Sequence, residues 1–383
     1  FYIGLAGLLL FEIMNVYFIM PLPKSQQINS IDFSYFLYSW RWVIRISFLT
    51  MIILGAFSAF TTRKKWRPLI AILLTTTVVY IFNFIMSADK MFLQPNHLVF
   101  KSESQNRIPK ERLVIGVAIS GEAKAYPVEF LTFHHQIRDS IGGKQLLITY
   151  CSVCRTGRVY EPIINGVFAK FRLVGMDHFN AMFEDEFTKS WWRQATGEAI
   201  TGILKGKILP EVESKQMTIN KWFELHPSGK VMQADESFLP IYDTLAKFEQ
   251  GKSEGNLTRT DSLSWENKSW VVGILASNYS KAYDWNTLIK EVVINDSIGG
   301  INIVLAISSD RQSFVAFERP SNKSFWIKND TLFSKEGFYN FLGHNLKEPT
   351  KRLNSIKAYQ EFWHSWLYFH PNTQKYITKI NNR

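Results

Sequence analysis

The sequence predicts a strand-rich α+β domain that is duplicated into two lobes and preceded by three transmembrane helices. Three observations support this fold class: a block of sequence that occurs twice, many short apolar runs separated by Gly, Pro and Asn, and long apolar stretches early in the chain. Short runs bounded by such residues are typical of strands. Hydrophobic residues make up 46% and aromatic residues 15% of the chain, which is enough to fill large cores and argues against disorder.

Three apolar stretches open the chain, at residues 1–21, about 40–61 and about 66–88. Each is close to the roughly 20 residues that cross a bilayer, so residues 1–88 are predicted to form three transmembrane helices in contact with lipid. The loop between the second and third stretches is rich in Lys and Arg, and such loops stay in the cytoplasm. Three spans then place residues 89–383 in the periplasm, outside a bacterial inner membrane.

Ionisable residues interrupt the apolar stretches at Glu12, Arg41 and Arg45. Charges within a bilayer usually face protein or water. One interpretation is that Glu12 contacts Arg45 inside the helix bundle, or that these groups meet a partner subunit. The other is that Arg41 and Arg45 extend to the lipid headgroups while Glu12 is protonated. We therefore assign the net charge of +11 to a membrane and membrane-protein partners, and expect no nucleic-acid partner.

The repeated block occupies residues 113–143 and 270–300, which align without a gap at an offset of 157 residues. Later in each copy an aromatic segment ends in His-Pro, at residues 226–227 and 370–371. Strands are predicted at 113–119, 145–150, 157–163, 167–175, 269–275, 301–307 and 313–318, and short amphipathic helices at 128–137, 218–226 and 357–369. The predicted domains are a transmembrane region 1–88, a linker 89–112, a first lobe 113–234, a connector 235–269 and a second lobe 270–377.

The second copy has lost three residues that can carry chemistry. Cys151 aligns with Ser308, Cys154 with Arg311 and His134 with Glu291. Residues that disappear together are candidates for a single site. The segment TYCSVCRTGRVYE predicts a strand, a turn holding both cysteines and a second strand, and the Cys-x-x-Cys spacing allows two thiolates to hold one metal ion.

The predicted ligands of this metal site are Cys151, Cys154, His134 and His178. Cys and His ligands suit zinc, whereas Cys, His and Met together suit copper, and Met176 lies close to His178 in the sequence. Two alternatives stay open at this point. Cys151 and Cys154 form a disulfide, since the periplasm oxidises neighbouring thiols, or they remain unlinked thiols. His135 on its own is better explained as a histidine on the surface of a helix.

The segment FEDEFTKSWWRQATGEAITG gathers carboxylates near two tryptophans. Asp185 and Glu198 are the candidates for a general acid and base, or for a sugar-binding platform beside Trp191 and Trp192. The alternative is a solvated acidic turn that is followed by buried tryptophans. Neither interpretation needs a bound cofactor.

The chain resembles the bacterial proteins grouped as domain of unknown function 3179, over roughly residues 90–375. The resemblance depends on TYCSVCRTG, on SWWRQATGEAITG and on the block AKAYPVEFL…DSIGG, which occur in the family's order. The family often has Cys-Pro-Leu-Cys-Gly where this chain has Cys151-Ser-Val-Cys154-Arg, and Trp-His-Glu where it has Phe133-His134-His135. The resemblance supports the choice of residues and the domain limits, and it implies no particular reaction.

Three functions are therefore considered, and whether the protein is an enzyme stays open. The leading hypothesis is an inner-membrane protein whose first lobe binds zinc or copper, for metal handling or as an accessory subunit of a membrane complex. The second is a non-catalytic structural subunit with a Cys151–Cys154 disulfide. The third is an enzyme that acts on envelope glycans or lipids through the segment around Glu198.

Overall fold

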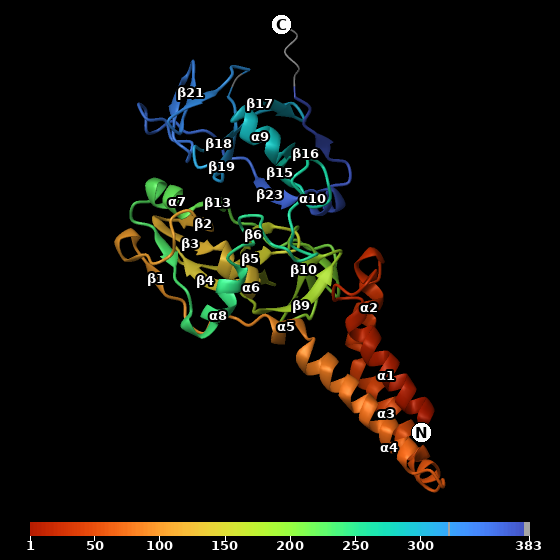
Figure 1. Cartoon of the computed structure of the whole chain (residues 1–383). Coiled ribbons are helices and arrows are strands. Elements are labelled where there is room, and N and C mark those ends of the chain that lie inside the picture. Colours follow the sequence, from red (N-terminus) through yellow and green to blue (C-terminus); the bar gives the residue numbers. More distant parts are fainter. Residues whose placement is uncertain (321, 379–383) are drawn as a thin grey trace. The chain divides into compact units, whose positions relative to one another are not determined.

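The computed structural model describes residues 1–320 and 322–378 and confirms the strand-rich α+β class. The chain divides into two compact units (Figure 1). Unit 1 comprises Phe1–Leu93 and Pro162–Leu209, and unit 2 comprises Gln94–Glu161 and Pro210–Arg383. The segment 162–209, which the sequence analysis assigned to the first lobe, thus belongs to the same unit as the N-terminal helices.

Unit 1 begins with the helices α1 (Tyr2–Tyr17), α2 (Ile31–Ser39), α3 (Arg41–Phe60) and α4 (Trp66–Tyr80), the last continuing as η2 (Ile81–Ile85). Two helices of the described chain, α3 and α4 with η2, are long and apolar enough to cross a membrane. Of the most apolar 18-residue stretch of each helix, only 6% in α3 and 11% in α4 with η2 is buried, so these helices do not resemble core helices of a globular domain. The predicted third span is not confirmed, because α1 has 16 residues and is shorter than the roughly 20 that a crossing needs.

Three polar residues of these helices, Glu12, Arg45 and Asn83, form one hydrogen-bonded cluster. Arg45 donates to both carboxylate oxygens of Glu12, with Nε–Oε1 at 2.7 Å and Nη2–Oε2 at 3.0 Å. Asn83 bridges the two, since its Nδ2 donates to Glu12 Oε2 at 2.9 Å and its Oδ1 accepts from Arg45 at 2.7 Å. The Glu12–Arg45 contact, one of the two interpretations of these charges, is therefore present. Arg41 instead stacks on the Tyr38 ring at 3.9 Å.

The remainder of unit 1 is a small antiparallel sheet of order β12-β11-β10-β9. Its strands are β9 (Phe171–Asp177), β10 (Asn180–Asp185), β11 (Trp191–Arg193) and β12 (Ala199–Thr201), and β7 (Ile163–Ile164), β8 (Val167–Phe168) and α5 (Ala88–Met91) complete the unit. Ile19, just after α1, packs in the core of this sheet with Met182 and Trp191, and its carbonyl accepts a bond from Met176 N at 2.7 Å.

The first half of unit 2 contains two sheets, of order β1-β14-β3-β2-β13 and β4-β5-β6. Its elements are β1 (Phe100–Lys101), β2 (Leu113–Ile119), β3 (Glu122–Pro127), α6 (Val128–His134), β4 (Gln136–Ile141), β5 (Lys144–Cys151), β6 (Thr156–Tyr160), β13 (Lys215–Thr218), α7 (Ile219–Leu225), β14 (Lys230–Met232) and α8 (Leu239–Leu245). The apolar runs predicted as strands at 113–119 and 145–150 are thus strands.

The second half contains sheets of order β23-β15-β16-β24, β17-β18-β19 and β20-β21-β22. Its elements are β15 (Trp270–Ala276), β16 (Tyr279–Asp284), α9 (Trp285–Glu291), β17 (Val293–Ile298), β18 (Ile301–Ile307), β19 (Phe314–Glu318), β20 (Trp326–Lys328), β21 (Thr331–Ser334), β22 (Gly337–Tyr339), β23 (Ala358–Phe362), α10 (Trp363–Phe369) and β24 (Gln374–Lys375). The helix predicted at 357–369 is therefore correct only in its second part, because residues 358–362 pair with β15 as a strand.

Corresponding elements of the two halves pair in the same way. β13 is antiparallel to β2 and β14 parallel to β3, just as β23 is antiparallel to β15 and β24 parallel to β16. Gly116 lies under the Trp222 indole and Gly273 under that of Trp366, so that a Cβ at either glycine would overlap the ring. Each half therefore closes one sheet face with a single buried tryptophan.

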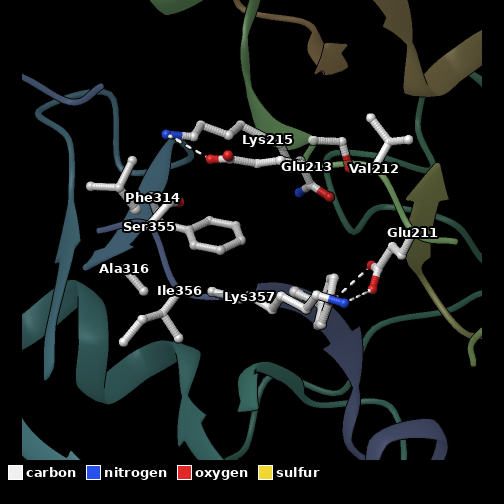
Figure 2. Close-up of a pocket in the computed structure, with 14 residues that line it drawn as sticks. Glu211, Val212, Glu213, Lys215, Phe314, Ala316, Ser355, Ile356 and Lys357 are labelled. Atoms are coloured by element: carbon white, nitrogen blue, oxygen red, sulfur yellow. Dashed lines mark hydrogen bonds and ion pairs between the residues drawn. The ribbon is translucent and has the colours of Figure 1, made fainter. Parts of the chain in front are cut away.

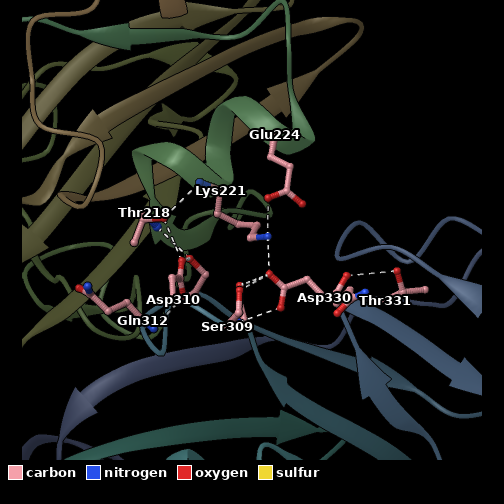
Figure 3. A network of polar contacts seen from close by, with 11 residues as sticks. Thr218, Lys221, Glu224, Ser309, Asp310, Gln312, Asp330 and Thr331 are labelled. Carbon is pink, nitrogen blue, oxygen red and sulfur yellow. Dashed lines mark hydrogen bonds and ion pairs between the residues drawn. The ribbon is translucent and has the colours of Figure 1, made fainter.

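A polar network joins α7 to loops of the second half (Figure 3). Lys221, whose side chain is 4% exposed, lies with Nζ 2.7 Å from Asp330 Oδ2 and 2.5 Å from Glu224 Oε2. Asp330 also accepts bonds from the hydroxyls of Ser308 and Ser309, at 2.7 and 2.8 Å. The buried ammonium is thus fully compensated, which fixes the contact between the two halves.

Substitution of Gly116 by Ala should destabilise unit 2 by about 1–3 kcal/mol, because the added methyl displaces the indole of Trp222 from a packed position. Urea unfolding of the full chain in detergent, followed by tryptophan fluorescence, would measure the change. Ala118→Val is the matched control, since it adds methyl groups at an exposed position of the same strand. Equal unfolding midpoints for the two variants would contradict the assigned packing.

Candidate functional site

The two cysteines lie where the sequence predicted them, in the turn between two paired strands. Cys151 is the last residue of β5 and pairs with Thr156, the first residue of β6. Both cysteines are 0% exposed, and within the described chain both are thiols, so the disulfide of the alternative hypothesis is not present. Arg155 closes the turn at a φ of 56°, a left-handed conformation that glycine adopts without strain.

Two buried arginines fasten this turn to the second half of unit 2. Arg155 donates from Nε to Gln360 Oε1 at 3.0 Å and from Nη2 to the Glu249 carbonyl at 2.6 Å. Its guanidinium also stacks on Trp270 at 3.7 Å. Arg158 pairs with Glu361 at 2.5 Å, and both side chains are at most 2% exposed.

Lys268 and His364 approach the same turn from the connector and from α10. Lys268 Nζ donates to the carbonyl of Val153, the residue between the cysteines, at 2.8 Å and to that of Leu257 at 2.6 Å. His364 Nε2 lies 3.1 Å from Lys268 Nζ and 3.3 Å from the Val153 carbonyl. The Cys154 carbonyl accepts a bond from Phe362 N at 2.9 Å. The cysteine turn is thus completed by residues that follow it by more than a hundred positions.

Two titratable groups, the Lys268 ammonium and the His364 imidazole, lie beside the cysteine turn. Burial lowers the pKa of Lys268 to about 8, while the nearby Cys154 and Cys151 act in the opposite direction. Burial, together with the charge of Lys268, lowers the pKa of His364 to about 4. At neutral pH the lysine is therefore the cation of the cluster and the imidazole is neutral. A cation beside a thiol lowers the pKa of that thiol and raises its reactivity.

The histidines predicted as metal ligands have other neighbours. His134 in α6 is 0% exposed, and its Nε2 lies 2.5 Å from the Tyr242 hydroxyl of α8. His178 belongs to unit 1, in the turn between β9 and β10, where its Nδ1 lies 2.7 Å from Asp177 Oδ1. In the residues that the structure describes, no three His, Cys, Asp or Glu side chains are grouped so as to hold a metal ion. Of the predicted ligands, the structure brings Cys151 and Cys154 together.

His135 is not on a helix surface as expected, because its side chain is only 2% exposed. It ends α6 at a φ of 60°, and its backbone is held on both sides: its N–H donates to the Leu131 carbonyl at 2.8 Å, and its carbonyl accepts from Tyr150 N at 2.9 Å. Burial lowers the pKa of its imidazole to about 4.

The acidic, tryptophan-rich segment has the geometry of a structural element. Asp185 is 0% exposed and accepts bonds from Thr188 N at 2.6 Å and from Trp192 Nε1 at 3.0 Å. Glu184 accepts likewise from Trp191 Nε1 at 3.0 Å. Glu198 is 41% exposed and lies 3.5 Å from Arg193. The tryptophans are buried as one interpretation predicted, but the carboxylates that hold them are buried as well, rather than solvated.

Sequence reasoning missed Lys268 and His364. Lys268 lies in a polar connector without periodicity, where nothing marks a single lysine as a tertiary neighbour of the cysteines. His364 left a weak signal: in the two matching segments NKWFELHP and HSWLYFHP, it stands where the first copy has Asn220. The second half thus has a histidine at this position, although it lacks the thiols.

Comparison with known protein families identifies the chain. Residues 95–373 match the family described as Protein of unknown function (DUF3179), which confirms the resemblance found in the sequence. The match covers well over half of the chain, so the protein belongs to this family. No curated protein and no solved structure shows significant similarity to it.

The buried His135 should make the fold sensitive to acid. Its pKa in the folded protein, about 4, lies below the ordinary value of 6.5, so below pH 6.5 the unfolded chain takes up a proton that the folded chain does not. The free energy of unfolding should therefore fall as the pH drops from 6.5 to 4, by about 3 kcal/mol for this residue.

Urea titrations between pH 4 and 7 would measure the total loss, to which the half-buried His226 and His364, also with a pKa of about 4, contribute as well. His135→Asn should make the loss smaller by about 3 kcal/mol. Asn is chosen because it tolerates the positive φ of this position. His97→Asn, at an exposed histidine, is the matched control. A pH dependence that stays the same in His135→Asn would show that the imidazole is not the group responsible.

Proposed function

We propose that this member of the DUF3179 family is a membrane-anchored dithiol protein, in which Cys151 and Cys154 exchange with a disulfide of a partner protein. One observation carries the proposal: the ammonium of Lys268 is held against the peptide between the two cysteines, within the field of both thiols. Thiolate character, which such a cation promotes, determines how fast a thiol attacks a disulfide.

The arrangement gives the two cysteines different roles. Cys154 interacts with Lys268 more strongly than Cys151 does, which supports Cys154 as the attacking thiolate. Its sulfur attacks the partner disulfide, forming a mixed disulfide and releasing one partner thiolate, which takes the proton of Cys151. The Cys151 thiolate then attacks Cys154, and the second partner thiolate leaves and takes a proton from solvent. Two thiols are oxidised and one partner disulfide is reduced.

Access to the cysteines requires local opening. Cys151 and Cys154 are 0% exposed, and Ser152 and Val153 between them are 7% and 4% exposed. Lys268 and Leu257, which meet at the turn, both belong to the irregular segment that follows α8. Irregular segments open at lower free energy than sheets, so the part of this segment around Leu257 moves for exchange, while Lys268, two residues before β15, stays beside the thiols.

The apolar helices and the charges beside them support a location for the proposed function. The loop between α3 and α4 carries Arg63, Lys64 and Lys65, and Arg67 follows at the start of α4; these basic residues favour the cytoplasmic side. Two crossings then return the chain to the outer side, so unit 2 faces the periplasm of a bacterial inner membrane, where disulfide exchange is available. The matching elements of the two halves support a duplication, in which the second copy kept the scaffold and lost the thiols.

The zinc or copper site expected from the sequence is the competing proposal, and thiol chemistry separates the two. The full-length protein in detergent would be equilibrated in glutathione buffers of graded potential, quenched with acid, and its thiols counted by a maleimide mass shift. We expect a reversible two-thiol transition that is absent in Cys151→Ser and Cys154→Ser.

Elemental analysis of the same preparation tests the competing proposal of a metal site. Near-stoichiometric zinc or copper that protects both thiols until a chelator is added would replace the dithiol proposal with metal binding. Thiols that stay reduced at every potential in a metal-free protein would overturn both proposals and leave a packed cysteine pair.

Lys268→Met should raise the pH midpoint of iodoacetamide alkylation toward the ordinary thiol pKa of about 8.5, because the cation that stabilises the thiolate is gone. Alkylation rates of the full-length protein between pH 5 and 9 would measure the midpoint. Lys268→Arg should keep most of the effect, and Lys252→Met, at an exposed lysine of the same segment, is the control. A midpoint unchanged in Lys268→Met would remove Lys268 from the proposed role.

A further inference from the structure

Two cavities of unit 2 lie along β13, away from the cysteine turn. Their volumes are about 250 Å³ and about 220 Å³, and they share Glu213, Lys215 and Ser355. Figure 2 shows the larger one, with Lys215 and Glu213 on one wall and Ile356 and Lys357 on the facing wall. In both, residues before or within β13 face residues of the second half of unit 2.

The smaller cavity is lined by an excess of positive and imidazole groups. Lys215, His226, His344 and Arg352 line it, whereas Glu213 is its sole carboxylate among the described residues. Lys215 Nζ lies 3.6 Å from Glu213 Oε1, but the glutamate side chain is 62% exposed, so solvent weakens this pair. His344 and Arg352 face one another across a β-bridge.

Lys215 and His226 are half-buried, whereas Arg352 and His344 are exposed, so solvent screens part of the repulsion among these groups. Burial lowers the pKa of Lys215, and the charge of Arg352 lowers it further, against the opposing effect of Glu213. Burial, then Lys215 and His344, lowers the pKa of His226 to about 4, so this imidazole is neutral at pH 7 and can donate one N–H. A bound anion would relieve this repulsion.

The cavity lining also includes apolar side chains. Trp222 is 1% exposed, its ring lies over Gly116, and the His226 ring packs against it with centroids 4.2 Å apart. Leu342 and Leu353 are the aliphatic residues of the lining. A ligand that fills the cavity would therefore meet both cationic groups and an aromatic and aliphatic surface.

We propose that this cavity is a binding site for a small carboxylate that carries a compact apolar or aromatic group. The carboxylate oxygens would bind Arg352, whose planar guanidinium can donate two parallel hydrogen bonds, and the ammonium of Lys215. The apolar group would pack against Trp222 and Leu353. The site is separate from the proposed dithiol function and does not depend on it.

Calorimetric titration of the full-length protein in detergent with sodium benzoate tests the proposal. We expect saturable binding at one site, weakened about tenfold or more by Arg352→Gln and by Lys215→Gln, because each removes a charged hydrogen bond. Lys351→Gln is the matched control: Lys351 pairs with Glu348 at 2.7 Å, is 59% exposed and does not line the cavity. Its removal takes away the same charge one residue from Arg352.

Three results would overturn the proposed carboxylate site. Equal weakening by Lys351→Gln and Arg352→Gln would reduce the effect to net charge and overturn the site. Inorganic phosphate that binds more tightly than benzoate, or an absence of benzoate binding to a folded protein, would also overturn it. Cys151→Ser should leave benzoate affinity unchanged, so failure of the dithiol proposal and failure of this one are separate results.

Discussion

The candidate site depends on one buried ion pair, between Arg158 of β6 and Glu361 of β23. Every oxygen of this carboxylate is in use: Oε1 accepts from Arg158 and from Thr156 Oγ1, and Oε2 accepts from Ser365 Oγ. A buried pair is tolerated only when its groups are satisfied in this way, and loss of one partner leaves an uncompensated charge, at a cost of about 3–5 kcal/mol. Because Phe362, next to Glu361, also donates to the Cys154 carbonyl, the same contact sets the position of the thiols.

It follows that the two halves of unit 2 contribute different parts of one site. The first half supplies Cys151 and Cys154, whereas the connector supplies Lys268 and the second half supplies His364. A pair of thiols in the second half would lack an equivalent histidine partner, because the first half has Asn220 at the position that matches His364. The absence of cysteines from the second half is thus consistent with a scaffold that needs one thiol turn and one surface to cover it.

Much of this fold was predictable, because local sequence carried the signal. Apolar runs bounded by Gly, Pro and Asn predicted strands of both halves, such as those at 113–119 and 301–307. The third predicted span was not confirmed for a specific reason: residues 18–21 are apolar and extend the first stretch to membrane length, but α1 ends at Tyr17, and Ile19 packs in the core of the unit 1 sheet. Hydropathy cannot distinguish burial in protein from burial in lipid. Only part of the candidate site could be predicted from the sequence. The Cys-x-x-Cys motif identified the two cysteines, whereas Lys268 becomes their neighbour through tertiary packing alone.

The order of elements along the chain places a further constraint on the cysteine turn. Strand β6 begins two residues after Cys154, and the chain then leaves unit 2 at Glu161 for the segment that packs with the N-terminal helices. It returns at Pro210, whose carbonyl accepts a bond from Glu161 N at 2.8 Å, so the excursion is closed at its base. One short strand therefore carries the thiol turn at one end and the exit to unit 1 at the other. The Arg158–Glu361 pair lies on that strand between them, and it anchors both features against β23.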